Sequence, residues 1–149
     1  MSTPPTNTPD VVVERTIEMS RERIFDAWLN PGLLATFMRP GDVARSTAEV
    51  DPRVGGRFRI VMAHSGGEFL HHGEYLEITR PSRLVFTWIS ASTDERPTTV
   101  MVELTELSAT RTRVVLTHRG LPARTVDAHR KGWGEIVERS AQLPALENG

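Results

Sequence analysis

The sequence predicts an α+β domain in which a mainly antiparallel sheet is closed by one long C-terminal helix. Three observations support this prediction. Short segments of alternating apolar and polar residues, separated by turn residues, run through most of the chain. Two short helical segments, residues 21–29 and 33–38, follow the first of these segments. A longer amphipathic segment, residues 122–143, comes last.

The expected strands are rich in β-branched residues and end at recognisable turn residues. They cover residues 11–18, 44–50, 57–64, 69–78, 83–89, 99–105 and 112–118. The connections between them are short, as at the hairpin turn Ser65-Gly66-Gly67 and at Arg80-Pro81-Ser82. Short connections join antiparallel neighbours, so we expect a meander and no strand–helix–strand repeat.

The two short helices are expected to be joined by a kink. Ile24, Ala27 and Trp28 recur at helical spacing after Ser20, which is the expected N-cap. Asn30-Pro31-Gly32 then interrupts the pattern before it resumes at residues 33–38.

The last helix carries a tryptophan between two glycines. One stripe of this helix should face the sheet, and it consists of Val126, Arg130, Trp133, Val137 and Ser140. Gly132 and Gly134 each cost about 1 kcal/mol of helix stability relative to alanine. This cost indicates that the glycines leave room beside Trp133, and a β-rich domain closed by such a helix is expected to hold a cavity for a small molecule.

Composition limits the classes of partner. The chain has 149 residues, 38% of them apolar and 25% charged, and a net charge of −1. No basic face predicts nucleic-acid binding, and the absence of cysteine removes disulfides and thiol nucleophiles. No apolar run reaches the roughly 20 residues that span a bilayer, and no signal sequence is recognised. We therefore expect a cytoplasmic domain at residues 10–146 after a disordered tail at residues 1–9, with no membrane partner.

Four segments, in this order and spacing, resemble a known family. They are residues 51–58 (DPRVGGRF), 73–78 (GEYLEI) and 81–88 (PSRLVFTW), followed by Gly132-Trp133. The combination is similar to the bacterial relatives of the activator of Hsp90 ATPase, within the superfamily of START, polyketide cyclase and birch-pollen-allergen-like (SRPBCC) domains. The resemblance covers nearly all of residues 11–143. Ser140 departs from the leucine that is more frequent in the family, and Pro144 ends the helix where relatives often continue it.

The resemblance implies a helix-grip fold. In this fold a curved antiparallel sheet, here of about six strands, wraps around the C-terminal helix and encloses an apolar cavity. Cavities of the superfamily bind sterols, lipids, polyketides and other hydrophobic compounds, and some host cyclisation or aldol-type chemistry.

Aromatic and soft apolar side chains, with one or two polar groups, are expected to line the cavity. The candidates are Trp133, Trp88, Phe58, Met62, Phe37, Met38 and Val137, with Tyr75 and His118 as polar groups. Phe86 and Trp28 are expected in the plain core.

Two questions stay open from the pattern alone. In residues 70–78, either Glu74 faces inward with His72, or Tyr75 and Glu77 do, because a slip of one residue reverses every assignment. His118 ends an inward-facing row and is either a hydrogen-bonded residue at the sheet rim or a polar group of the cavity.

No metal, cofactor or catalytic constellation is predicted. The adjacent His71 and His72 point to opposite faces of one strand, and no histidine pair has the helical spacing of a zinc site. Gly55-Gly56 lacks the Lys and the Ser or Thr of a phosphate-binding loop.

Three functions follow as hypotheses. The first is a binding module for a small hydrophobic molecule, in which two copies could pair as a homodimer. The second is an enzyme of the polyketide cyclase type that uses a cavity carboxylate or histidine as acid or base. The third is a co-chaperone that interacts with Hsp90.

Overall fold

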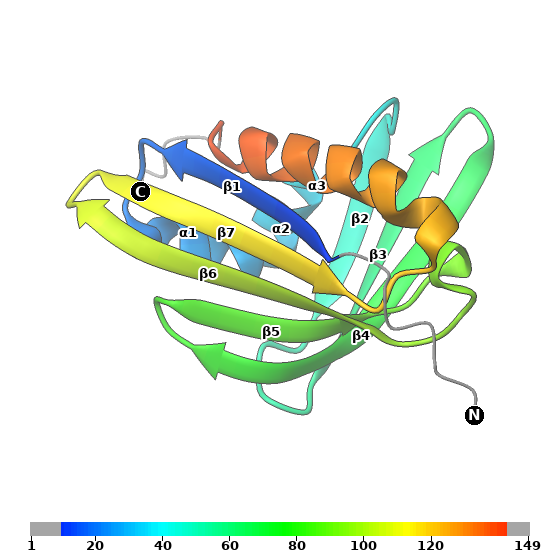
Figure 1. Ribbon diagram of the computed structural model, residues 1–149, viewed down its shortest axis with the longest axis horizontal. Helices are drawn as coiled ribbons and strands as arrows, with labels where there is room; N and C mark the ends of the chain where they lie inside the picture. Colours follow the sequence, from blue (N-terminus) through cyan, green and yellow to red (C-terminus); the bar gives the residue numbers. More distant parts are fainter. Residues whose placement is uncertain (1–9, 143–149) are drawn as a thin grey trace.

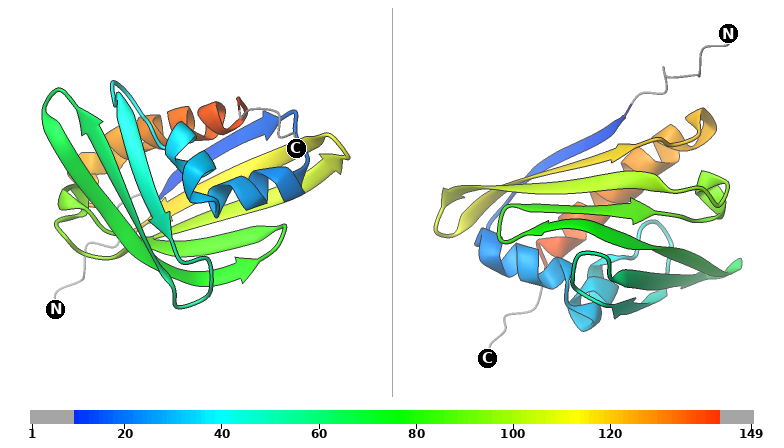
Figure 2. Two further views of the ribbon diagram at one scale, coloured as in Figure 1. Left: turned by 180° about the vertical axis from the view of Figure 1, so that it is seen from behind. Right: turned by 90° about the horizontal axis from the view of Figure 1, so that it is seen from below.

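The computed structural model describes residues 10–142 and forms a single curved antiparallel sheet with three helices. The strand order is β1-β7-β6-β5-β4-β3-β2. The strands are β1 (Val11–Ile17), β2 (Arg45–Val50), β3 (Arg57–His64), β4 (Gly67–Thr79), β5 (Arg83–Trp88), β6 (Thr98–Ser108) and β7 (Arg111–Arg119). Figures 1 and 2 show the sheet curling around the helices, which lie on its concave side. The expected antiparallel meander and helix-grip architecture are confirmed.

The sheet has seven strands, one for each of the seven expected segments, whereas the helix-grip fold was expected to have about six. The first strand forms one edge of the sheet, where Val13 of β1 pairs with Leu116 of β7. β2, which pairs with β3, forms the opposite edge. The expected tail at residues 1–9 lies outside the described residues, as do Pro144 and the expected domain end at residue 146.

The helices are α1 (Arg21–Trp28), α2 (Pro31–Phe37) and α3 (Val126–Ser140), with single 3-10 turns at Ala91–Thr93 (η1) and Ala123–Thr125 (η2). The expected kink between α1 and α2 is confirmed. The Ser20 hydroxyl accepts the Arg23 N–H of α1, and the Asn30 side chain accepts the Leu33 N–H of α2. α3 begins later than expected because η2 occupies the residues after Pro122.

A β-bulge in β4 answers the question of register. Tyr75 is buried at 2% exposure and faces inward, but the pairing with β5 shifts between Tyr75 and Glu77. Leu76 is consequently exposed, Ile78 packs on the core, and Glu77 lies outward at 3.0 Å from Arg83. Glu74 alternates with Tyr75 and also points outward. The second alternative is therefore correct for Tyr75 but wrong for Glu77, and neither glutamate faces inward.

Gly73 allows β4 and β5 to approach closely. A Cβ atom at this position would lie 1.9 Å from the Thr87 carbonyl oxygen, which is part of the backbone. Only glycine fits where a second strand passes at this distance.

Gly73→Ala should therefore destabilise the protein by about 3 kcal/mol or more, because the clash can be relieved only by separating two paired strands. Urea unfolding of the full chain measures this loss. Gly32→Ala is the matched control, since its Cβ would lie 3.4 Å from the Asn30 side chain and helical Gly→Ala is neutral or stabilising. Equal stability of the Gly73 variant and the wild type would contradict the packing described here.

Candidate functional site

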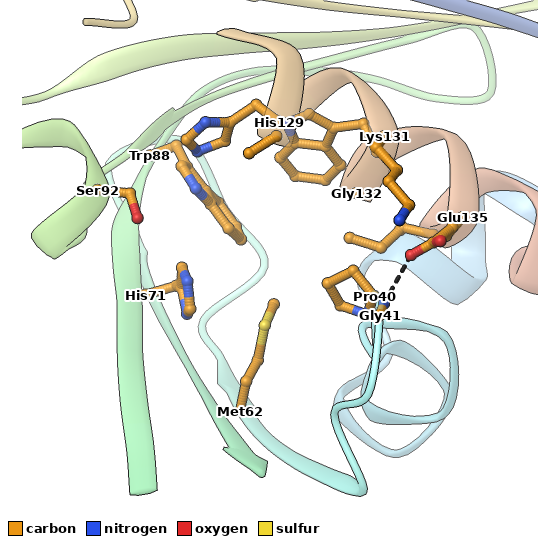
Figure 3. Close-up of a pocket in the computed structure, with 13 residues that line it drawn as sticks. Pro40, Gly41, Met62, His71, Trp88, Ser92, His129, Lys131, Gly132 and Glu135 are labelled. Atoms are coloured by element: carbon orange, nitrogen blue, oxygen red, sulfur yellow. Dashed lines mark hydrogen bonds between the residues drawn. The ribbon is translucent and has the colours of Figure 1, made fainter. Parts of the chain in front are cut away.

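A pocket of about 310 Å³ lies between the N-terminal half of α3 and the sheet. Its walls come from α3, the turn after α2, β3, β4, β5 and η1 (Figure 3). The lining residues are Pro40, Gly41, Met62, His71, Trp88, Ser92, Ala128, His129, Lys131, Gly132, Trp133, Glu135 and Ile136. The exposed Ala128 and Lys131 belong to its rim.

The pocket continues into a groove between η1 and the hairpin of β3 and β4. The groove has a volume of about 490 Å³ and shares Met62, His71 and Ser92 with the pocket. Phe69 and Leu70 line it and are 41% and 42% exposed. Glu68 and Glu95 also line the groove, so the space that leads from the hairpin to the pocket has both apolar and charged walls.

A chain of hydrogen bonds joins α3 to three strands behind the pocket. The indole N–H of Trp133 donates to Nδ1 of His118 at 2.8 Å, so Nδ1 is an acceptor and the proton of the neutral ring is on Nε2. Nε2 donates to the Thr98 hydroxyl at 2.7 Å, and this hydroxyl donates to the Trp88 carbonyl at 2.6 Å. Each polar atom in this series of hydrogen bonds thus has a defined partner and a defined role as donor or acceptor.

His118 is fully buried in this chain. Burial, together with the smaller effect of the neighbouring His129, lowers its pKa to about 3. The ring is therefore neutral at physiological pH, as its acceptor role toward Trp133 requires. His118 lies neither at the sheet rim nor on the pocket wall, but directly behind Trp133.

Trp133 forms a rigid wall. Its ring lies 4.9 Å from that of Trp88 and 6.4 Å from that of Trp28, and it is 2% exposed. The flanking glycines differ in their surroundings. Gly132 lines the pocket, and a Cβ atom there would make ordinary contact with Pro40 at 3.5 Å. A Cβ atom on Gly134 would lie 3.1 Å from the Arg15 guanidinium, so this position is the tighter of the two.

Two histidines contribute polar groups to the pocket. His71 comes from β4 and His129 from the first turns of α3. Burial lowers the pKa of His71 to about 4 and also lowers that of His129. Both rings are therefore neutral at pH 7, and they are hydrogen-bonding groups rather than charges.

The nine residues that the sequence predicted to line the cavity fall into three groups. Trp133, Trp88 and Met62 line the pocket. Phe58, Met38 and Tyr75 surround, with Trp88, a separate void of about 10 Å³, which is room for one water molecule at most. Phe37, His118 and Val137 are buried and line neither space.

Sequence reasoning missed the pocket positions of His71, His129, Pro40 and Ile136. His129 is four residues before Trp133 on a helix, so this spacing was a usable signal. The inward direction of His71 depended on the strand register, and the approach of Pro40 to Gly132 is a long-range contact with no local signal.

Known proteins resemble this chain in sequence and structure. The family described as activator of Hsp90 ATPase homolog 1-like protein matches residues 18–143. A structure from Chromobacterium violaceum has 22% identity and a TM-score of 0.78, covering 90% of this chain and 96% of the other. One from Nitrosomonas europaea has 23% identity and a TM-score of 0.75, covering 91% and 94%. An HSP90 activator from Plasmodium falciparum has 29% identity and a TM-score of 0.61, covering 87% and 83%.

No curated protein matches the sequence significantly. Within residues 10–142, no group of three or more His, Asp or Glu side chains is placed to hold a metal ion. In the same part of the chain, no helix is long and apolar enough to cross a membrane.

Thr98→Val should destabilise the protein by about 1–3 kcal/mol, because the isosteric side chain leaves the buried Nε2–H of His118 without an acceptor. Thermal or urea unfolding measures the change. Thr99→Val is the matched control on the same strand, since the Thr99 hydroxyl forms no hydrogen bond within the described chain. A loss no larger than that of the control would contradict the hydrogen-bond chain.

Stability should also fall in mild acid. In the unfolded chain His118 and His71 titrate near 6.5, but in the folded chain near 3 and 4. Below pH 6.5 the unfolded state therefore binds protons that the folded state does not, and stability is lost progressively as the pH falls toward 4. Each ring should contribute about 1–2 kcal/mol of loss between pH 7 and pH 5. Urea midpoints at the two pH values test this, and His71→Phe should flatten the dependence; equal midpoints for the wild type would refute it.

Proposed function

The chain belongs to the family of activator of Hsp90 ATPase homolog 1-like proteins, and from this premise we propose that it binds a small, largely hydrophobic molecule between α3 and the sheet. The observation that supports this most strongly is the lining of the pocket. Trp88, Trp133, Met62 and Ile136 supply apolar walls, and only a few polar groups interrupt them. The volume of about 310 Å³ lies at the lower end of the range of small-molecule sites, roughly 300–1,000 Å³.

The walls are held in place before any ligand enters. Trp133 is fixed by its hydrogen bond to His118 and by ring contacts with Trp88 and Trp28. A preformed apolar site loses little conformational freedom on binding, which favours affinity for a rigid ligand.

The enzyme hypothesis has less support. The pocket contains the polar pair that it requires, His71 and His129, but burial lowers the pKa of both rings, which makes them weak bases at neutral pH. The one carboxylate on the lining, Glu135, accepts the Gly41 N–H at 2.6 Å. These groups suit hydrogen bonding to a ligand better than proton abstraction from it.

Ala128→Trp should block the pocket from its rim, because Ala128 is exposed and lines it. Binding of N-phenyl-1-naphthylamine, an uncharged fluorescent probe, should weaken at least tenfold, since loss of about 60 Å² of apolar burial is worth about 1.5 kcal/mol. Fluorescence titration of the full chain measures the affinity.

Ala123→Trp is the matched control for this test. Ala123 is also exposed but lies in η2 and does not line the pocket. The control should bind the probe as the wild type does. Absence of probe binding to the wild type, or equal binding by both variants, would contradict the proposed function.

A second candidate function is stimulation of an Hsp90 ATPase. The family match and the likeness to an HSP90 activator from Plasmodium falciparum support it. An ATPase assay with purified Hsp90, together with a pull-down by the immobilised chain, tests this candidate. Failure in both assays would remove it and would leave the binding function untouched.

A further inference from the structure

The polar atoms of the pocket have fixed hydrogen-bonding roles. His129 Nδ1 lies 2.9 Å from the Thr125 carbonyl oxygen, and a carbonyl can only accept. Nδ1 therefore carries the proton of the neutral ring, and Nε2 is an acceptor. Nε2 forms no hydrogen bond within residues 10–142, so it is available to a donor group of a ligand.

Trp88 contributes a hydrogen-bond donor, whereas His129 contributes an acceptor. Its indole N–H can only donate, and it is buried without a hydrogen-bond partner among the described residues. The side chain is 3% exposed and lines the pocket. The nitrogen is closed to solvent in this arrangement, so an acceptor group on a ligand reaches it only after a small shift of the surrounding side chains. The new hydrogen bond would recover the free energy that an unpaired buried donor costs.

His71 lies beside Trp88. Its ring is 5.1 Å from the Trp88 ring, and backbone groups of Phe69 and Ile60 interact with it. The neutral ring has one donor and one acceptor, so it adapts to either kind of ligand group. Figure 3 shows His71, Trp88, Ser92 and His129 together along one side of the pocket.

The charged groups are on the other side. Lys131 and Glu135 lie beside Gly41 and Pro40 in Figure 3, and Glu135 already accepts the Gly41 N–H. The polar side therefore presents no fixed charge, and neutral histidines do not compensate the desolvation of a carboxylate. This arrangement selects against an anionic head group at that side.

We propose that the pocket selects an uncharged ring compound of about two fused rings that carries, on one edge, a donor for His129 Nε2 and an acceptor for Trp88 Nε1, as a hydroxyl group does. This inference rests on the proposed function and specifies its ligand class. The size follows from the volume, since a dry cavity of about 150 Å³ accommodates benzene and this pocket has about twice that volume.

Three probes of nearly the same shape test the ligand class by calorimetric titration of the full chain at pH 7.5. They are 2-naphthol, naphthalene and 2-naphthoate. We expect 2-naphthol to bind about tenfold more tightly than naphthalene, which corresponds to one net hydrogen bond. The anion 2-naphthoate should bind more weakly than 2-naphthol.

The variant His129→Phe tests whether His129 is responsible for the preference for 2-naphthol over naphthalene. It keeps an aromatic ring but removes the acceptor, so the affinity for 2-naphthol should fall to that for naphthalene, whose own affinity should stay the same. His72→Phe is the matched control, because His72 adjoins His71 on β4 and lines none of the three spaces described above. If His129→Phe fails to fold, Trp88→Phe removes the donor and should lower the preference in the same way.

The outcomes separate this inference from the proposed function. Equal binding of 2-naphthol and naphthalene to the wild type, or tightest binding of 2-naphthoate, overturns the ligand class but leaves the binding function standing. A preference that survives in His129→Phe overturns the role of that residue. Binding of none of the three probes, together with no binding of N-phenyl-1-naphthylamine, contradicts the proposed function itself.

Discussion

The hydrogen bond between the Trp133 indole and His118 sets the distance between α3 and the sheet. The bond belongs to a series of hydrogen bonds that ends at the Trp88 carbonyl. This series connects α3 to the neighbouring strands β7, β6 and β5. A buried polar chain of this kind is favourable only when every member is satisfied. The neutral state of His118 meets that condition, because its two nitrogens then have one acceptor and one donor role.

The pocket follows from this constraint. With Trp133 held against Trp88 and Trp28, the first turns of α3 stand away from the β3 and β4 strands, and the space between them is the pocket. Gly134 lets the next turn of the same helix lie close to the Arg15 side chain of β1. The helix therefore packs closely there and leaves room at the pocket, which Gly132 lines.

Much of the fold could be predicted from the sequence because its signals are local. The alternating strands, the Ser20 cap and the break at Asn30-Pro31-Gly32 depend on neighbours within one element. The same is true of the Trp133 stripe, of which only Arg130 proved to be exposed. The bulge after Tyr75 could not be predicted, since it depends on how β4 pairs with β5. A hydrogen-bonded His118 was one of the two alternatives, but its place behind Trp133 could not be predicted for a similar reason: its partners Trp133 and Thr98 belong to other elements, and only the fold places them at both ring nitrogens.

The indole N–H signals in a proton–nitrogen correlation spectrum test the account most directly. The chain has three tryptophans, so the signals can be assigned by substitution. On titration with 2-naphthol, the account predicts that the Trp88 signal moves strongly, while the Trp133 signal stays protected from solvent exchange and moves little. A Trp133 signal that exchanges rapidly in the free protein, or a Trp88 signal that does not respond to a bound ligand, would contradict it.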